Sequence, residues 1–490
     1  MDRSIRHFHE ISTRVFQKIT EEFFKNPKDF ASFTSGITDE LHNLGRVMIQ
    51  ETLEEMDEML RESDARKRNW VIENRSDKQL VTVLGTVNFK KTFFKNKTTG
   101  KTKCLLDQIL GLDKNERIAE DACAKILEEA VQTSYRRGGE VATFTETEVA
   151  KQTVMNKLHA LQFPKGWEEP EEKKIVPYLY IEADEDHISL QYREKKGDIK
   201  KTERGKKDNN AIAKLIYVHE GIEPEAPQST RNRLINPHYF SRTAEGCSND
   251  ELWDEVYRYL DDNYELSKVR KIFLSSDGGG WIKSGMRRIG GLVHLLDQYH
   301  LEKQLTKLTA HMKDSVNDAR AELHRTICKG TKPEFSQLLW RLKGELPKDT
   351  DPERFDDAGN YILNNWTAAR LRLQKTQGKV GSSTEGHVSH VLSCRMSTAA
   401  LGWSLLGADK MAQLRAYYLN GGDMLSLVRY QKTELKKAAG DEEVYFSASN
   451  INSSTRNKNG VLGKYHDSMQ HHLCGDWKVK RYFQEHIFKL

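Results

Sequence analysis

Hydrophobic and polar positions change their period along the chain, and these changes predict where helices give way to strands. Through residues 36–70 apolar side chains recur at helical spacing, which predicts a long helix or a helical pair. Residues 79–106 instead alternate Val, Thr and Phe around Gly-containing turns, as in a small antiparallel ribbon. Residues 116–161 return to helical spacing. There we expect two helices broken at Arg137–Gly139 and a third that begins after a capping box of Thr145 and Glu148.

A Pro-containing linker is predicted before a second change of pattern. The strand after it is expected to stop at Asp184, to turn near Asp186, and to be followed by strands in HISLQYR and AIAKLIYVHEGI. A helix, a strand ending at Asp277 and further helices come next. Three antiparallel strands followed by alternating helices and strands are typical of a mixed sheet of the ribonuclease H type, with the first and fourth strands adjacent at its centre.

These patterns predict a multidomain α+β or α/β protein. Its catalytic core is expected to be a ribonuclease H-like mixed sheet with an all-helical insertion, preceded by a helical and small β-ribbon DNA-binding region. The predicted divisions are 1–75 (helical, suited to oligomerisation), 76–163 (β-ribbon and helix-turn-helix), 164–177 (linker), 178–300 with 381–420 (catalytic domain), 301–380 (helical insertion) and 421–490 (C-terminal region).

Charge is nearly balanced over the 490 residues, with 77 Lys and Arg against 72 Asp and Glu, so local patches must carry any affinity for nucleic acid. Lysines of the ribbon can follow a phosphate backbone or protect a strand edge from aggregation, and those of the loop after the second strand fit a DNA clamp or a solvated hairpin tip. The third helix can read a major groove or be part of a helical hairpin. The candidate DNA contacts are Lys90, Lys91, Lys95, Lys151, Gln152, Asn156, Lys195, Lys196, Lys200 and Lys201.

Cysteine spacing and hydropathy exclude several classes of protein. The six cysteines form no CxxC pair, so neither a zinc ribbon nor a disulfide framework is expected. No apolar run is long enough to span a membrane and the amino terminus lacks a secretory core, which predicts a cytoplasmic protein. The residue types of His466, His471, His472 and Cys474 could bind zinc, but their spacing fits no standard site, and we interpret them as an incidental polar terminus.

Acidic residues end two of the predicted strands. Asp277 is followed by three glycines, and Asp184 closes the apolar run of the earlier strand. A carboxylate at a strand end, with small residues beside it, suits metal-assisted phosphate chemistry, although Asp-Gly is also a common turn. Glu182 and Asp186 share a strand face with Asp184, so the first acid is open to alternatives.

Three segments, YIEADEDHISLQ, SSDGGGWIK and EGHVSHVLSCRMSTAALGWS, resemble those of the ISLre-type bacterial insertion-sequence transposases, which are related to the Mutator-like group. The resemblance covers most of the chain and includes LLDQYHLEK, with Asp297 and His300, and CLLDQILGL. It implies an Asp-Asp-Glu triad of Asp184, Asp277 and Glu385 that binds Mg²⁺ or Mn²⁺, two ions to a site.

The same resemblance implies a function. The implied function is metal-dependent cleavage and strand transfer of double-stranded DNA, at element terminal repeats and in target DNA. The protein would be bacterial and nucleoid-associated when bound to DNA. Joining two ends implies a homo-oligomer, at least a dimer. His387 and Arg395 are candidate contacts of the scissile phosphate, with a surface ion pair as the alternative for Arg395.

Two departures from the family pattern leave a second hypothesis open. Glu185 follows Asp184 where many relatives have Gly, and the stretch after Arg395 lacks a second Arg and a Pro. A domesticated, transposase-derived DNA-binding or regulatory protein without transposition activity is therefore the alternative.

Overall fold

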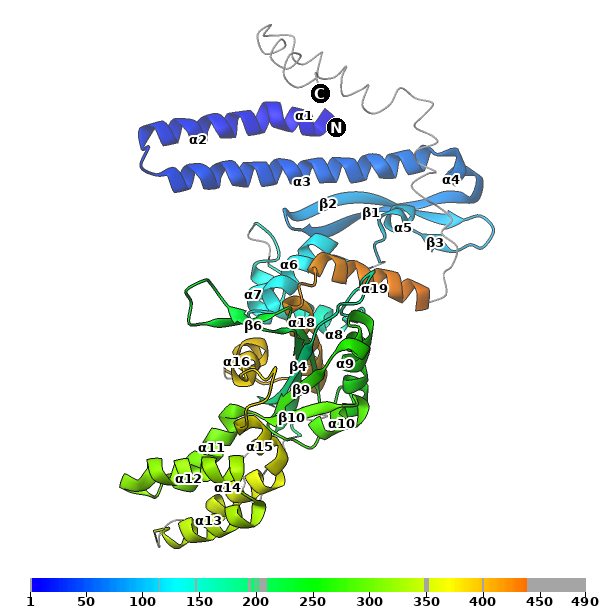
Figure 1. The fold of residues 1–490 in the computed structure, drawn as a ribbon. Helices are drawn as coiled ribbons and strands as arrows, with labels where there is room; N and C mark the ends of the chain where they lie inside the picture. Colours follow the sequence, from blue (N-terminus) through cyan, green and yellow to red (C-terminus); the bar gives the residue numbers. More distant parts are fainter. Residues whose placement is uncertain are drawn as a thin grey trace. The chain divides into compact units, whose positions relative to one another are not determined.

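The structure is a computed structural model, and it describes residues 2–113, 115–145, 148–192, 195–198, 201, 209–347, 352–398 and 401–438 (Figure 1). The chain forms two compact units, Met1–Val154 with Met424–Leu490 and Met155–Asp423. In the described part of the chain, no helix has the length and apolar character needed to cross a membrane.

A helical hairpin and an antiparallel ribbon make up most of the first unit. Its first arm contains α1 (Asp2–His7), a π-helical turn (Phe8–Ser12) and α2 (Thr13–Lys25), and it runs antiparallel to α3 (Phe30–Glu62), as Figure 1 shows. After α4 (Asp64–Asn69), β1 (Trp70–Thr82) pairs with β2 (Gly85–Asn96), and β3 (Thr102–Lys103) lies at the edge. The predicted ribbon is therefore present, and β1 begins nine residues before the apolar alternation that revealed it.

The rest of the first unit is helical. It comprises α5 (Leu105–Leu110), α6 (Glu120–Ala130), α7 (Tyr135–Glu140), the start of α8 (Lys151–His159), and α19 (Met424–Ala438). Ion pairs of Arg429 and Lys432 with Glu120 join α19 to α6, at 3.2 and 3.0 Å.

Two predictions about these helices were wrong. Gly138 and Gly139 lie inside α7 rather than breaking a helix, because they let α7 pack closely: a Cβ on Gly139 would lie 1.9 Å from the carbonyl oxygen of Val149. The third helix begins at Lys151, so the segment from Thr145 to Glu148 does not cap it. The side chain of Thr145 contacts the hydroxyl of Thr143 instead, at 3.1 Å.

A five-stranded mixed sheet is the centre of the second unit. Its order is β10 (Leu292–Leu296), β9 (Lys271–Ser276), β4 (Tyr178–Ser189), β5 (Asn210–His219) and β8 (His238–Thr243). The pairs β4–β5 and β5–β8 are antiparallel, whereas β4–β9 and β9–β10 are parallel. A separate hairpin is formed by β6 (Gly221–Pro224) and β7 (Asn232–Ile235).

The adjacency of the first and fourth predicted strands is confirmed, because β4 pairs with β9. The strand boundaries differ from the prediction. Asp184 and Asp186 both lie within β4, which continues to Ser189 without a turn, so HISLQYR is not a separate strand. The third strand is β8, whose six residues carry too few alternations to stand out in the sequence.

Alternation along β4 decides which face of the sheet is apolar. Leu179, Ile181 and Ala183 are buried against α9 (Asn249–Asn263) and α10 (Ile282–Arg288), whereas Glu182 and Asp184 point to the opposite face. Ser248 and Glu251 form a capping box that begins α9. Further helical segments in this unit are Leu266–Lys268, α16 (Thr384–Val388), Ser389–Ser393, α17 (Cys394–Met396) and α18 (Leu405–Leu419).

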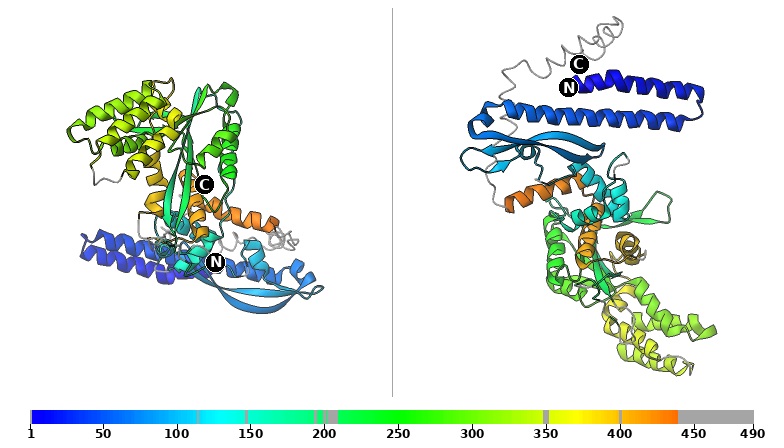
Figure 2. Two further views of the ribbon diagram at one scale, coloured as in Figure 1. Left: turned by 90° about the horizontal axis from the view of Figure 1, so that it is seen from below. Right: turned by 180° about the vertical axis from the view of Figure 1, so that it is seen from behind.

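The region predicted as an insertion is helical. It contains α11 (Gln298–Thr309), a short 3₁₀ turn (Lys313–Ser315), α12 (Val316–Lys329), α13 (Lys332–Gly344), α14 (Glu353–Asn364) and α15 (Trp366–Leu373). These helices share an apolar core that includes Leu305, Leu323 and Phe335. In Figure 2 the sheet stands between this group of helices and α9.

Candidate functional site

Acidic residues meet where the pairing of β4 with β9 ends. The last paired residues are Ala183 and Ser276, so Asp184 and Asp277 follow at the same edge of the two strands. Asp184 is 5% exposed and Asp277 is half-buried. The amide of Gly279 donates to Oδ1 of Asp277 at 2.8 Å, and the hydroxyl of Tyr361 donates to the Asp277 carbonyl at 2.5 Å.

Asp184, His300 and Glu385 form a group with the residue types of a metal site. One ligand atom from each lies within 4.8 Å of those of the other two. Glu385 is exposed in the first turn of α16, and His300 comes from α11. Asp277 is outside this group among the described residues, but its charge contributes to the pKa values of Asp184 and His300. The structure thus brings together two of the three predicted acids with His300, a predicted supporting residue.

Asp297 fixes the ring of His300. Its carboxylate accepts from both the amide (3.1 Å) and Nδ1 (3.2 Å) of His300, as well as from the Ser382 hydroxyl. Burial opposes ionisation of Asp297, but these hydrogen bonds lower its pKa to about 2. The bond to Asp297 raises the pKa of His300. Because Nδ1 is engaged, Nε2 is the ring nitrogen that can act as a ligand, an arrangement common among metal-binding histidines.

Asp184 has the opposite electrostatic setting. Burial raises its pKa to about 7, and the charges of Asp277 and Asp297 act in the same direction. The amide of Glu185 and the charge of His300 oppose this increase. A buried carboxylate among other acids is stabilised by a bound cation, so the electrostatics of this edge favour a metal ion.

Glu182 is a buried anchor that sequence analysis considered only as an alternative first acid. It is 2% exposed, and its pKa is lowered because donors outweigh the effect of burial. The donors come from β5 and from the segment just before Glu385: Tyr217 hydroxyl (2.8 Å), His219 Nε2 (3.3 Å), Ser382 hydroxyl (3.1 Å), Ser383 amide (3.0 Å) and Thr384 hydroxyl (2.6 Å). Glu182 therefore ties the segment that carries Glu385 to the strand that carries Asp184. The sequence signal was its place on the Asp184 face of β4.

The other supporting candidates are engaged in contacts within the protein. Arg395 is 5% exposed, so it does not lie at the surface as an ordinary surface ion pair would require, and its guanidinium lies 4.9 Å from the ring centroid of Trp403. Nδ1 of His387 is 3.1 Å from the hydroxyl of Tyr239, and burial lowers the pKa of His387. The carboxylate of Asp186 accepts from the hydroxyl of Ser397 at 2.8 Å.

Glu185 stands where many of the resembled transposases have glycine, and it has a structural partner. The indole Nε1 of Trp281 donates to its carboxylate at 2.8 Å. This bond links β4 to the glycine turn after Asp277.

One predicted DNA contact was wrong. Lys91 is 5% exposed, and its ammonium group pairs with Asp107, which also lies 3.5 Å from the ammonium of Lys78. This buried pair leaves Lys91 unavailable to a phosphate backbone. The exposed candidates are Lys90, Lys95, Lys151, Gln152, Asn156, Lys195, Lys196 and Lys201. Lys200, His466, His471, His472 and Cys474 lie outside the described residues.

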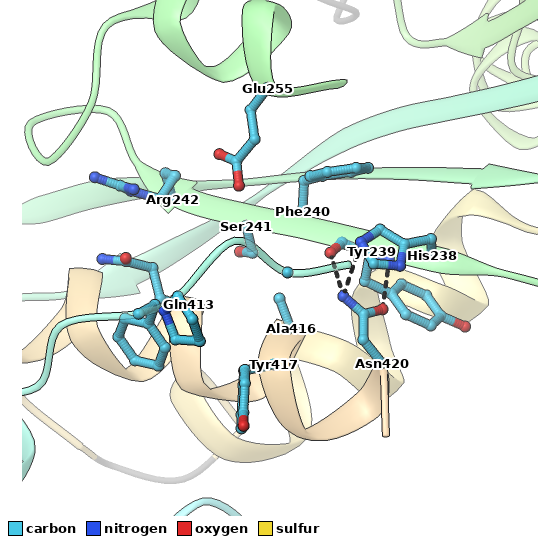
Figure 3. Close-up of a pocket in the computed structure, with 13 residues that line it drawn as sticks. His238, Tyr239, Phe240, Ser241, Arg242, Glu255, Gln413, Ala416, Tyr417 and Asn420 are labelled. Carbon is cyan, nitrogen blue, oxygen red and sulfur yellow. Dashed lines mark hydrogen bonds between the residues drawn. The ribbon is translucent and has the colours of Figure 1, made fainter. Parts of the chain in front are cut away.

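A separate cavity of about 50 Å³ lies between β8, α18 and Glu255 of α9 (Figure 3). At its edge the side chain of Asn420 bonds both the amide and the carbonyl of Tyr239, at 2.8 and 2.9 Å. Burial lowers the pKa of His238 beside it to about 4. The volume suits a few water molecules rather than a larger ligand, so we do not treat this cavity as the candidate functional site.

Fold and site together define a multidomain α+β protein with a carboxylate and histidine group at the edge of a mixed sheet. The chain belongs to the uncharacterised protein family UPF0236, whose model matches residues 24–434. A UPF0236 protein of Caldanaerobacter subterraneus subsp. tengcongensis is 33% identical over 412 residues, which cover 84% of this chain and 82% of the relative. Two others from that organism are 34% identical over 381 residues, which cover 78% of this chain and 76% and 72% of their own.

Proposed function

We propose that this protein is a DNA transposase similar to the ISLre type, which binds element ends and target DNA and carries out metal-dependent strand cleavage and strand transfer. The observation that carries the proposal is the convergence of Asp184, Glu385 and His300, beside Asp277, at one edge of the sheet. The three acids Asp184, Asp277 and Glu385 lie 93 and 108 residues apart in sequence, in the order that the resemblance implies.

The order of the strands supports a ribonuclease H-like core. In chain order the first three strands are antiparallel neighbours, while the fourth and fifth are parallel to the first and lie on its other side. That is the arrangement of the ribonuclease H sheet, in which acids on the central strands perform phosphodiester chemistry. Proteins that share a fold can differ in function, so the proposed activity depends on the acidic group itself.

The residues at this edge fit divalent cations. Asp184, Asp277 and Glu385 offer carboxylate oxygens, the ligands that Mg²⁺ and Mn²⁺ prefer, and His300 offers a nitrogen held in place by Asp297. Two such cations, when bound, supply the charge stabilisation that an in-line displacement at phosphorus requires.

The surrounding side chains have positioning tasks in this proposal. Glu182 fixes the segment before Glu385, and Tyr361 holds the backbone of Asp277. Because its pKa is raised to about 7, the Asp184 carboxyl still holds a proton part of the time near neutral pH, and a bound cation would displace that proton. Water is the proposed attacking group for cleavage. The released 3′-hydroxyl then attacks target DNA at the same residues.

Gene multiplicity among the relatives also supports a mobile element. The name of one relative joins eleven locus designations, and the names of two others join four and two. Many loci for one protein in one organism are what the copying of an element produces, whereas a domesticated gene is expected at a single locus.

The test is cleavage of labelled DNA that contains the sequences flanking the gene, with purified full-length protein and Mg²⁺ or Mn²⁺. We expect products with 3′-hydroxyl ends, and a loss of rate of at least about 1,000-fold in Asp184→Asn, Asp277→Asn and Glu385→Gln. Asp186→Asn is the matched control. It removes a carboxylate from the same strand, where Asp186 accepts a hydrogen bond from the Ser397 hydroxyl, and it should keep cleavage within about threefold.

Two results would reject the proposal. One is unchanged cleavage by the Asp277→Asn protein. The other is DNA binding by the wild type without cleavage with either metal, which would favour the domesticated alternative.

A further inference from the structure

Apolar side chains are exposed along the helical hairpin of the first unit. Phe24 is 74% exposed, Phe30 59% and Leu41 53%. None of the residues of α2 is fully buried, although its apolar positions gather on one face. Exposed apolar side chains that form a continuous stripe, rather than being scattered singly, mark an interaction surface.

The two halves of helix α3 differ in how far their apolar residues are buried. Its second half packs Leu53 and Leu60 into the core that it shares with β1 and β2. Before Leu53, the buried residues of α3 are Glu40 and Glu51, and neither is apolar. The same helix thus buries Leu53 and Leu60 against the ribbon, whereas the apolar residues of its first half are exposed (Phe30 and Leu41) or half-buried (Phe33, Ile37 and Leu44).

Polar contacts hold the two arms of the hairpin together. The hydroxyl of Ser12 donates to Glu40, and the amides of Arg3 and Ser4 donate to Glu51 at 2.8 and 2.7 Å. Because these bonds form part of the seam between the arms, much of the apolar surface is left on the outside. The hairpin is therefore ordered by itself but incompletely buried.

The spacing of the apolar positions indicates what kind of partner fits. Along the first half of α3 they recur at intervals of three and four residues, as in helices that pack against another helix: Phe30, Phe33, Ile37, Leu41, Leu44 and Met48. At the loop end, Phe23 stacks on Phe33 with ring centroids 4.4 Å apart, beside exposed Phe24 and Phe30. Two paired helices with one apolar face make half of a four-helix bundle.

Charge and size favour a second copy of this chain as the partner. Residues 13–50 contain five basic and five acidic side chains, so the surface favours neither nucleic acid nor an acidic peptide and does not repel itself. The exposed stripe of α3 is about 30 Å long and the pair of helices about 20 Å wide. Two such faces bury about 1,200 Å² in total, which is within the range of a specific interface.

From these observations we infer that residues 13–50 form the dimer interface, by packing against the same hairpin of a second copy to make a four-helix bundle. The interface depends on the hairpin and not on the acidic group, so it stands whether or not the chain cleaves DNA.

The first test is the mass of the purified full-length protein by light scattering. For the wild type at about 10 μM we expect twice the 56.5 kDa mass of one chain. For the double variant Phe24→Glu with Leu41→Glu we expect a monomer, because the dissociation constant of the dimer should rise at least about 100-fold. Ile175→Glu is the control, because Ile175 is equally exposed, at 72%, but belongs to the second unit. Circular dichroism checks that the double variant keeps its helices.

The second test does not depend on a destabilising substitution. Isotopically heavy and light chains are each made with a photoreactive phenylalanine analogue at position 30, then mixed and irradiated. We expect cross-links between heavy and light chains within residues 13–50. A monomeric wild type, a dimer that survives in the folded double variant, or cross-links that stay within one chain, for example to residues 439–490, would overturn the inference.

Discussion

Two carboxylates on one face of β4 have opposite pKa shifts because their hydrogen-bond donors differ. Glu182 and Asp184 are both almost fully buried, so desolvation penalises the charge of each. Hydroxyl, amide and imidazole donors converge on Glu182 and lower its pKa, whereas Asp184 accepts the amide of Glu185 and has acidic neighbours. One residue is thus built to stay charged within the protein, and the other to be neutralised by a proton or a cation.

This contrast predicts opposite stability changes for conservative substitutions. The folded pKa of Asp184, about 7, exceeds its ordinary value of 3.8, so the folded state loses stability as pH rises from about 4 to about 7. In metal-free protein at pH 8, Asp184→Asn should therefore stabilise the second unit, by at most about 4 kcal/mol. Glu182→Gln should destabilise it by about 2 kcal/mol or more, because the amide group opposes several donors.

Urea unfolding in the presence of a chelator, at pH 5 and pH 8, measures both effects. The gain in Asp184→Asn should shrink at pH 5, where the wild-type carboxyl is protonated in the folded state. Equal gains at the two pH values, or a loss of stability in Asp184→Asn at pH 8, would contradict this account.

At the scale of elements, α7 shows how glycine can serve packing inside a helix. From the sequence alone the Gly-Gly pair predicts a helix break, because glycine has a low helix propensity. In the structure, Gly139 faces the carbonyl of Val149, and Gly138 lies against α6. Close approach of backbones outweighs helix propensity here, and sequence pattern alone does not reveal that approach.

Substitution of Gly139 tests this role. We expect Gly139→Ala to destabilise the first unit by about 2–3 kcal/mol, because its Cβ would overlap a backbone carbonyl that cannot move as a side chain can. Gly344→Ala at the end of α13 is the control: its Cβ meets nothing within 4 Å, so the change should be neutral or slightly stabilising. Thermal unfolding of both variants is the measurement. Indistinguishable melting of Gly139→Ala and the wild type would argue against the close approach.

Sequence pattern predicted the elements whose apolar residues form long, regular runs. The β1–β2 ribbon, the pairing of β4 with β9 and the helical insertion were all visible in this way. What it missed depends on contacts across large sequence separations. Glu182 accepts a hydrogen bond from Thr384 across 202 residues of sequence. His300 was named from a family motif, but no sequence pattern placed it beside Asp184 and Glu385. Lys91 was predicted as a DNA contact because the pattern of its own strand does not show that its ammonium group pairs with Asp107.

On the scale of the whole molecule, the candidate site is contained in one unit. Asp184, Asp277, His300 and Glu385 all belong to Met155–Asp423. The insertion helices support the strands beside the site, because Arg372 of α15 donates to the carbonyl of Leu296 in β10 at 2.7 Å and to the hydroxyl of Ser275 in β9 at 2.6 Å. Within the described part of the chain, the apolar clusters of the second unit likewise consist of its own residues.

A fragment of residues 148–423, which keeps α8 whole, should therefore fold and bind Mn²⁺ as the full chain does. We expect dissociation constants within about threefold of each other in titration calorimetry, because each ligand and each positioning contact described above is retained. Glu385→Gln in the same fragment should weaken binding at least about tenfold, which corresponds to about 1.4 kcal/mol. A folded fragment that binds Mn²⁺ tenfold more weakly than the full chain would mean that residues outside this unit complete the site.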